Sequence, residues 1–125
     1  AAYANLNGGM LTAAGSLIMG GGSDPNVNIA HLFLNDGTID VDSLSMLTGD
    51  VLMDIKQGEL LLQGNKTDLV DQYVADELIV GYGGSGDVNV DYDVGLRKTV
   101  VTAVPEPLTG ALLGFGGLIL LRRRR

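Results

Sequence analysis

The 125-residue sequence predicts a mainly-β fold, namely the C-terminal part of a parallel β-helix (solenoid) with one short capping helix. Nineteen glycines with only six Phe and Tyr residues indicate many turns around a core of small aliphatic side chains. A turn glycine followed by alternating apolar residues recurs around Gly9, Gly37 and Gly58, which are 28 and 21 residues apart. Those spacings are close to one solenoid rung. A β-sandwich or jelly roll explains the same alternation and remains the alternative fold.

The three recurrences are "NGGMLTA", "NDGTIDV" and "KQGELLL". Asn-Gly-Gly and Asn-Asp-Gly suit the left-handed backbone of tight turns, and the alternation after Gly37 predicts Ile39 and Val41 inward with Asp40 and Asp42 in water. A solenoid rung cannot bury its apolar face alone, and three partial rungs are about the minimum for stability. We therefore expect more rungs to precede these, and a natural protein that is longer at its N-terminus or processed there.

One helix is expected after Asn65, over about ten residues of the "KTDLVDQYVAD" stretch. Thr67 is the predicted cap, and Asp68 and Asp71 suit the positive end of the helix dipole. Helical spacing places four apolar residues on one face: Leu69, Val70, Tyr73 and Val74. We expect this helix to cover the open end of the strand stack, where exposed apolar edges would otherwise aggregate.

Two strands are expected to close the body of the chain. The stretch "DVNVDYDV" alternates with period two, and the second strand runs from Lys98 to Val104. The predicted inward positions of the first strand are Val88, Val90, Tyr92 and Val94, and the predicted solvent positions are Asp87, Asn89, Asp91 and Asp93.

The charge and the composition exclude several classes of function. Residues 1–104 contain fourteen Asp and Glu against four Lys and Arg, a net charge of −10 that repels phosphate backbones. Nucleic acid is therefore not an expected partner. The chain has no cysteine, which excludes disulfides, thiol catalysis and Cys-based metal sites. We expect no cofactor, no metal site and no catalytic residue.

Three motifs carry candidate chemistry and have simpler structural explanations. Gly81, Gly83 and Gly86 match G-x-G-x-x-G, but a strand follows them where a dinucleotide site needs a helix, so a Gly-rich hairpin or inter-rung loop is predicted. His31 is the only histidine, no G-x-S-x-G elbow accompanies it, and a hydrogen-bonded strand histidine is expected. Two aspartate clusters fit solvated strand faces, with weak calcium binding as the alternative: Asp36, Asp40, Asp42 and Asp87, Asp91, Asp93.

The C-terminal stretch "VPEPLTGALLGFGGLILLRRRR" has a separate organisation. Residues 108–121 carry no charge, and as a helix they would span ~21 Å against ~30 Å of bilayer hydrocarbon, which predicts a short transmembrane helix. Its membrane-facing residues would be Leu108, Leu112, Leu113, Phe115, Leu118, Ile119, Leu120 and Leu121. The C-terminus would be held in the cytoplasm by four arginines, Arg122, Arg123, Arg124 and Arg125. A terminal helix in a soluble core is the alternative.

Pro105 and Pro107 stop such a helix from extending backwards, so residues 104–107 are expected to be extended and accessible to a processing enzyme. The last 21 residues contain, in order, Pro105, Glu106 and Pro107, the apolar segment and the arginine cluster. This order resembles the PEP-CTERM sorting signal of exported bacterial proteins. The resemblance implies recognition of these three residues by exosortase, a membrane-embedded processing enzyme, and delivery to the cell surface or exopolysaccharide matrix. The preceding body also resembles the closing rungs of β-solenoid surface proteins.

These observations give one leading hypothesis. Residues 1–104 would be a β-rich extracellular region and residues 105–125 a sorting tail, so the chain would be an exported, noncatalytic surface or matrix protein held transiently in the inner membrane. Exosortase, the membrane and exopolysaccharide are the expected partners. Two alternatives stay open: a fragment of a β-helix polysaccharide lyase or glycosidase, since parallel β-helices support such activities, and a single-pass membrane protein whose tail is retained.

Overall fold

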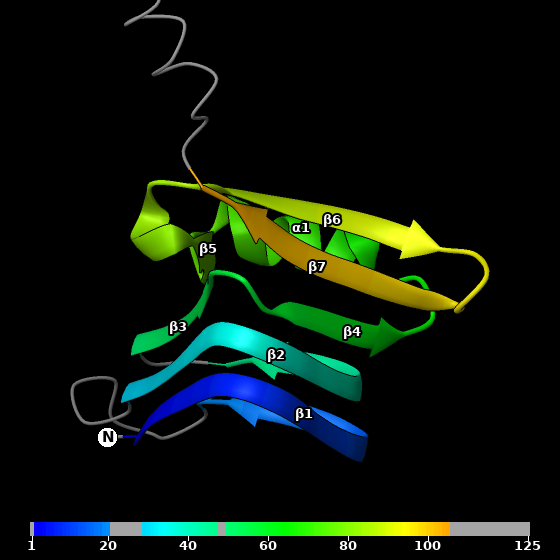
Figure 1. Cartoon of the computed structure of the whole chain (residues 1–125), viewed down its shortest axis with the longest axis horizontal. Helices are drawn as coiled ribbons and strands as arrows, with labels where there is room; N and C mark the ends of the chain where they lie inside the picture. Colours follow the sequence, from blue (N-terminus) through cyan, green and yellow to red (C-terminus); the bar gives the residue numbers. More distant parts are fainter. Residues whose placement is uncertain (1, 21–28, 48–49, 106–125) are drawn as a thin grey trace, which may run out of the picture.

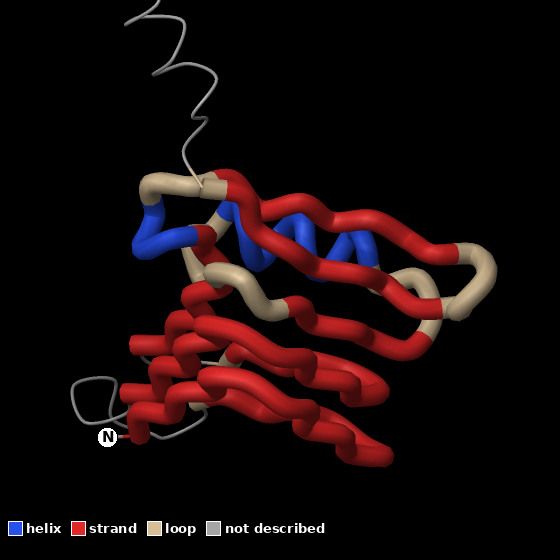
Figure 2. The backbone as a smooth tube through the Cα atoms, in the orientation of Figure 1, coloured by secondary structure: helices blue, strands red, loops and turns tan. Residues whose placement is uncertain are grey.

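The structure, a computed structural model, describes residues 2–20, 29–47 and 50–105. Strands dominate these ranges, as Figure 2 shows. The elements of Figure 1 are, in chain order, β1 (Ala2–Met19), β2 (Ile29–Met46), β3 (Asp50–Ile55), β4 (Glu59–Gln63), α1 (Thr67–Ala75), β5 (Ile79–Gly81), the 3₁₀ turn η1 (Tyr82–Gly84), β6 (Asp87–Asp93) and β7 (Lys98–Val104).

The first five strands stack in parallel. β1 pairs with β2 along its whole length. On its other edge, β2 pairs with β3 over its first half and with β4 over its second half. The same line through the sheet joins Leu11, Ile39 and Leu60, at offsets of 28 and 21 residues that equal the glycine spacings in the sequence. β5 then pairs in parallel with β3.

The recurring glycines lie over one another at a corner of this stack. A Cβ built on Gly37 would be 2.6 Å from the carbonyl oxygen of Gly9, and one on Gly58 would be 2.5 Å from the Leu34 side chain and 3.0 Å from the carbonyl oxygen of Gly37. Gly37 also has a φ of 94°, which side-chain-bearing residues rarely adopt. The repeat therefore marks a place where successive backbones approach too closely for a side chain.

The last two strands reverse direction. β7 pairs antiparallel with β4, and β6 pairs antiparallel with β7, so β6 ends the strand order β5-β3-β2-β4-β7-β6. The bounds of β7 are those predicted, and the mainly-β prediction is confirmed. All seven strands belong to one curled sheet, in contrast to the two packed sheets of the alternative β-sandwich (Figure 1).

The apolar core lies inside the curl of the sheet. Its buried residues come mostly from β2, β3, β4, β5, β7 and α1: Leu34, Ile39, Val41, Leu44, Met46, Val51, Met53, Ile55, Leu60, Leu62, Val70, Ile79 and Val101. From β1 only Met19 joins this buried set, while Leu6 and Leu17 pack against it in part. The predicted inward positions Ile39 and Val41 are confirmed, and Asp42 is exposed as expected, whereas Asp40, also predicted in water, is partly buried because it pairs with Lys98.

The single described α-helix covers the closing end of the stack, as expected, beside β5 and β6 (Figure 1). The predicted cap is wrong: Lys66 is the N-cap residue without a side-chain cap, and Thr67 is the first helical residue, which donates from its N–H and its hydroxyl to Asn65 Oδ1. Val70 is buried and Tyr73 and Val74 pack on the core. Leu69 is exposed, because it points away from the sheet that Val70 meets.

One strand prediction also needs correction. Val88 and Val90 pack against the core and alternate with exposed Asp87, Asn89 and Asp91, as predicted. Val94 is exposed because β6 ends at Asp93 and residues 94–97 form the turn into β7.

The predicted membrane helix and arginine cluster lie outside the described residues. Within the ranges that the structure describes, no helix is both long enough and apolar enough to cross a bilayer.

Candidate functional site

The predicted sorting motif begins at the last residue that the structure describes. Pro105 is described and exposed, directly after the last residue of β7, whereas Glu106 and Pro107 lie outside the described residues, as do the predicted membrane and arginine positions. Val104 is still held in the sheet opposite Asp87 of β6. The buried core formed by the described residues runs from Met19 to Val101.

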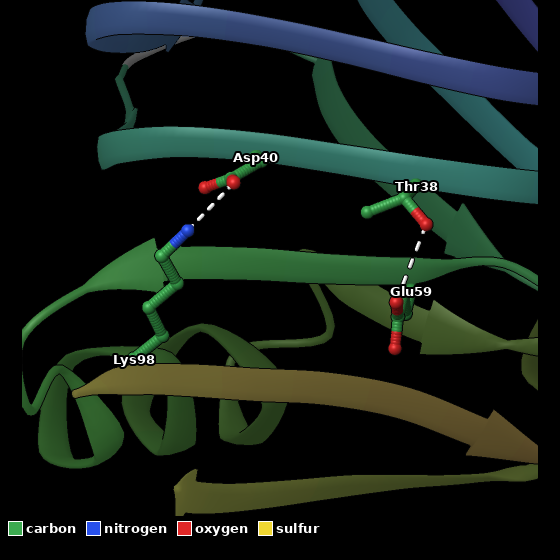
Figure 3. A network of polar contacts seen from close by, with 4 residues as sticks. All are labelled: Thr38, Asp40, Glu59 and Lys98. Carbon is green, nitrogen blue, oxygen red and sulfur yellow. Dashed lines mark hydrogen bonds and ion pairs between the residues drawn. The ribbon is translucent and has the colours of Figure 1, made fainter. Parts of the chain in front are cut away.

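A second candidate is the outer polar face of the sheet, which we define by Thr38 and Asp40 of β2, Glu59 of β4 and Lys98 of β7. These four side chains point to the side of the sheet opposite the buried Ile39, because neighbouring residues of a strand alternate between faces (Figure 3). They come from three strands that are far apart in the sequence, and the strand order β2-β4-β7 brings these strands together.

The outer polar face has specific contacts. Lys98 Nζ donates to Asp40 Oδ2 at 2.6 Å across the intervening strand β4, and Thr38 Oγ1 donates to Glu59 Oε1 at 3.2 Å (Figure 3). Both members of the ion pair are mostly buried, so water screens the pair less than it screens an exposed one. The pair links the closing strand to the parallel stack.

A hollow of about 420 Å³ opens beside this face, between the turn glycines and β7. Its polar lining includes Thr38, Lys56, Glu59 and Thr102. Asp36 also lines it, but Asp36 Oδ1 accepts a hydrogen bond from the Gly37 N–H at 2.8 Å. Hydroxyl, carboxylate and ammonium groups on an open strand surface are suited to hydrogen bonding with sugar hydroxyls.

The glycine-rich stretch forms a loop between two strands, as predicted. The Gly86 N–H donates to the Gly81 carbonyl at 2.9 Å, and β6 follows at once in place of the helix that a dinucleotide site requires. The Gly83 N–H donates to Asp54 Oδ1 at 2.9 Å. The loop borders a groove of about 720 Å³ whose floor includes Leu52, Val74, Ile79 and Val88.

Asp54 is a residue that the sequence analysis missed. It is a buried carboxylate in β3, and its bond to Gly83 anchors the loop to the stack. An acidic residue inside the apolar strand "VLMDI" was the available signal, because buried carboxylates need a partner.

The aspartate clusters have structural roles. Asp40 pairs with Lys98, and Asp93 Oδ1 accepts from the Leu96 N–H at 3.0 Å in the turn between β6 and β7. Among the described residues no three His, Asp or Glu side chains are grouped to hold a metal ion. Weak calcium binding by these clusters therefore has no support from the geometry.

His31 lies in β2 between two aromatic rings, edge-on to Tyr3 at 5.4 Å and to Phe33 at 6.3 Å between ring centroids. Its Nε2 lies 3.1 Å from Asp50 Oδ1, which is within ion-pair distance, but it has no hydrogen-bond partner among the described residues. The prediction that His31 lies in a strand is confirmed, and an acidic partner lies near Nε2 without the expected hydrogen bond.

No family model, no curated protein and no solved structure matches the chain. The function is therefore inferred from the chain's own residues and geometry.

Proposed function

We propose that this chain is the closing part of a parallel β-solenoid in an exported, noncatalytic bacterial surface or matrix protein, which exosortase sorts through the C-terminal tail. The observation that carries the proposal is the order of the tail: Pro-Glu-Pro at residues 105–107, an uncharged apolar segment, then four arginines. This order directly follows an acidic body rich in strands.

The solenoid part of the proposal is supported by the parallel pairing of β1, β2 and β3–β4. Side chains of the same kind face each other on successive strands: Asn35 Nδ2 donates to Asn7 Oδ1 at 2.8 Å, and the hydroxyls of Ser16 and Ser43 are 2.5 Å apart. Such ladders are typical of strands stacked in register. The closing end carries α1, in keeping with the capping element that a solenoid needs.

The sorting part of the proposal is supported by the charges on either side of the apolar segment. The body carries a net charge of −10 before Pro105, and the four final arginines follow the apolar residues. Arginines flanking an apolar segment favour the cytoplasmic side. Exosortase would then act near Pro105, which is exposed at the end of β7.

The test is a reporter fused to residues 105–125 and expressed in a host with exosortase and in the same host lacking it. We expect the mature reporter to lose mass and leave the inner membrane only where exosortase is present. A matched fusion with Pro105→Ala, Glu106→Ala and Pro107→Ala keeps the apolar segment and arginines, and should stay in the membrane at full mass. Equal mass and equal anchoring in both hosts would contradict sorting and favour a retained single-pass anchor.

Exopolysaccharide is the proposed partner of the body, through the outer polar face. The support is that Thr38 and Glu59 of this face line the hollow of about 420 Å³, which Thr102 also lines. We expect Glu59→Gln and Thr102→Val to weaken binding of the intact protein to the host's exopolysaccharide, with Asp71→Asn on the exposed side of α1 as the control. Cleavage of the glycan that disappears with Glu59→Gln would instead favour the lyase or glycosidase alternative.

A further inference from the structure

The last three residues of β7 have fewer strand partners than the rest of that strand. β7 lies between β4 and β6, and residues 98–101 pair with both of these neighbours (Figure 1). Residues 102–104, which we call the end segment, pair within the described ranges with β6 alone, because the ladder with β4 ends at Val101. The hollow of about 420 Å³ lies beside the end segment and is lined in part by Thr102 and Ala103.

Opening the end segment would expose little of the core. Val101, just before it, is 0% exposed, whereas Thr102 and Ala103 are half-buried and Val104 is exposed. Of the three residues of the end segment, Ala103 is the one that packs against the apolar core. A segment with few buried contacts can open locally while the rest of a protein stays folded.

The glycine-rich loop between β5 and β6 packs against the end segment. A Cβ built on Gly81 would be 2.8 Å from the Ala103 Cβ, and one built on Gly86 would clash with the Val104 carbonyl oxygen. Both glycines therefore lie where a side chain would push the end segment away. The loop is itself held by the hydrogen bond between the two glycines and by the Asp54 carboxylate of β3, which accepts from a loop N–H. The G-x-G-x-x-G stretch thus has a structural role at the end of β7.

The end segment directly precedes the sorting motif. Pro105 follows Val104 with no residue between them. An enzyme that binds its peptide in extended form uses the backbone N–H and C=O groups of the residues beside the motif. In the closed sheet β6 is paired with each residue of the end segment. The residues ahead of the motif therefore become available to an enzyme when the end segment leaves β6.

We propose that the end segment must leave β6 before exosortase can take up the sorting motif, and that the loop from Gly81 to Gly86 controls how often it does so. This inference rests on the proposed function and adds to it a step that regulates access to the motif. When opening and closing are fast compared with cleavage, the rate of processing follows the population of the open state. Weaker contacts with the loop should then speed processing, and a cross-link that closes the end segment should stop it.

The first experiment closes the end segment with a disulfide, using the absence of cysteine from the chain. Asp87 of β6 and Val104 of β7 are exposed partners, so the pair Asp87→Cys and Val104→Cys holds the end segment on β6 once oxidised. We express the intact protein in a host with exosortase and follow the mass of the mature protein. Processing of the oxidised variant should be at least about tenfold slower than that of the wild type, and added reductant should restore it.

The control places the same cross-link earlier in β7. Asp91, on the charged edge strand β6, is paired with Val100, which β4 also holds, so Asp91→Cys and Val100→Cys link the two strands without restraining the end segment. We expect this variant to be processed like the wild type. Equal slowing by both cross-links, or no slowing by the first, would overturn the inference. An unprocessed wild type would instead overturn the proposed function.

The second experiment measures opening without exosortase, by amide hydrogen exchange of the full chain in a nonionic detergent. We expect the amides of the end segment that bond to β6 to exchange at least about tenfold faster than those of residues 98–101. Gly86→Ala should speed exchange in the end segment about five- to thirtyfold, because its Cβ meets the Val104 carbonyl, and should raise the rate of processing by a similar factor.

Gly95→Ala, in the turn at the other end of β6, is the matched control and should change neither exchange in the end segment nor processing. Equal exchange along the whole of β7, or exchange in the end segment that does not respond to Gly86→Ala, would overturn the inference whether or not exosortase sorts the protein.

Discussion

The two ends of the strand stack carry similar apolar residues, but these residues are buried at one end and exposed at the other. One line through the sheet joins Leu11 of β1, Ile39 of β2, Leu60 of β4 and Val101 of β7. The side chains of β2, β4 and β7 on this line are 0% exposed, whereas Leu11 is 47% exposed. Burial along this line therefore depends on having a paired strand on both sides, and among the described residues Leu11 has one on one side alone.

The largest difference in stability between the two ends is expected when leucine side chains on this line are shortened to alanine. We expect Leu60→Ala to lower the free energy of unfolding by about 2–5 kcal/mol, because it leaves a cavity in a packed core. Leu11→Ala should cost less than about 1 kcal/mol, because Leu11 is already half in water. Urea unfolding followed by circular dichroism measures both, and equal costs would show that β1 is buried by something else.

The turn glycines Gly9 and Gly37 allow the same comparison between inner and outer strands to be made for the backbone. Gly37→Ala should cost about 2–4 kcal/mol, because its Cβ would meet the Gly9 carbonyl and a left-handed φ adds strain. Gly9→Ala has the same kind of φ with nothing within 4 Å of the new Cβ, so about 1–2 kcal/mol is expected. The difference in urea midpoint between the two variants isolates the clash. Identical midpoints would mean that the strands separate at this corner at little cost.

The ion pair between Lys98 and Asp40 tests how the closing strand is attached. Lys98→Met should lower stability by about 1–2 kcal/mol, since it leaves a mostly buried carboxylate unpaired. Combining it with Asp40→Asn should cost less than the sum of the single changes. Lys56→Met, at an exposed position, is the control and should change stability by less than about 0.5 kcal/mol. Strict additivity would show that the pair contributes nothing.

The smallest effect on stability is expected at the charged edge. Asp91→Val should change the free energy of unfolding by less than about 0.5 kcal/mol, because the side chain is exposed. It should nevertheless raise light scattering at high protein concentration, because it removes a charge that discourages edge pairing on β6. Scattering equal to that of the wild type would mean that Asp87 and Asp93 protect this edge without it.

The sequence predicted the parts of the fold that depend on local or repeated signals. Glycine spacing gave the offsets of the parallel strands because a close backbone approach leaves no room for other residues. Alternation predicted two of the buried positions of β2, Ile39 and Val41, and the bounds of β7 agree with the prediction.

The missed features depend on neighbours that are distant in the sequence. Leu69 and Val94 are apolar and fit their local patterns, yet Leu69 is 38% exposed and Val94 is 76% exposed. The contacts of Asp54 with Gly83 and of Lys98 with Asp40 span 29 and 58 residues, so only the strand order brings these partners together. The apolar neighbours of Asp54 were a local signal that it is buried, whereas nothing near Asp40 in the sequence distinguishes it from the other acidic residues.

The tyrosines give each end of the molecule its own spectroscopic reporter. The chain has four tyrosines and no tryptophan. Tyr3 lies edge-on to His31 at β1, whereas the Tyr73 hydroxyl on α1 accepts from the Met46 N–H at 3.3 Å and is 3.4 Å from the Leu44 carbonyl oxygen. Aromatic resonances of the unlabelled protein can therefore distinguish fraying of the first strand from undocking of the helix, and show which opens first as temperature rises.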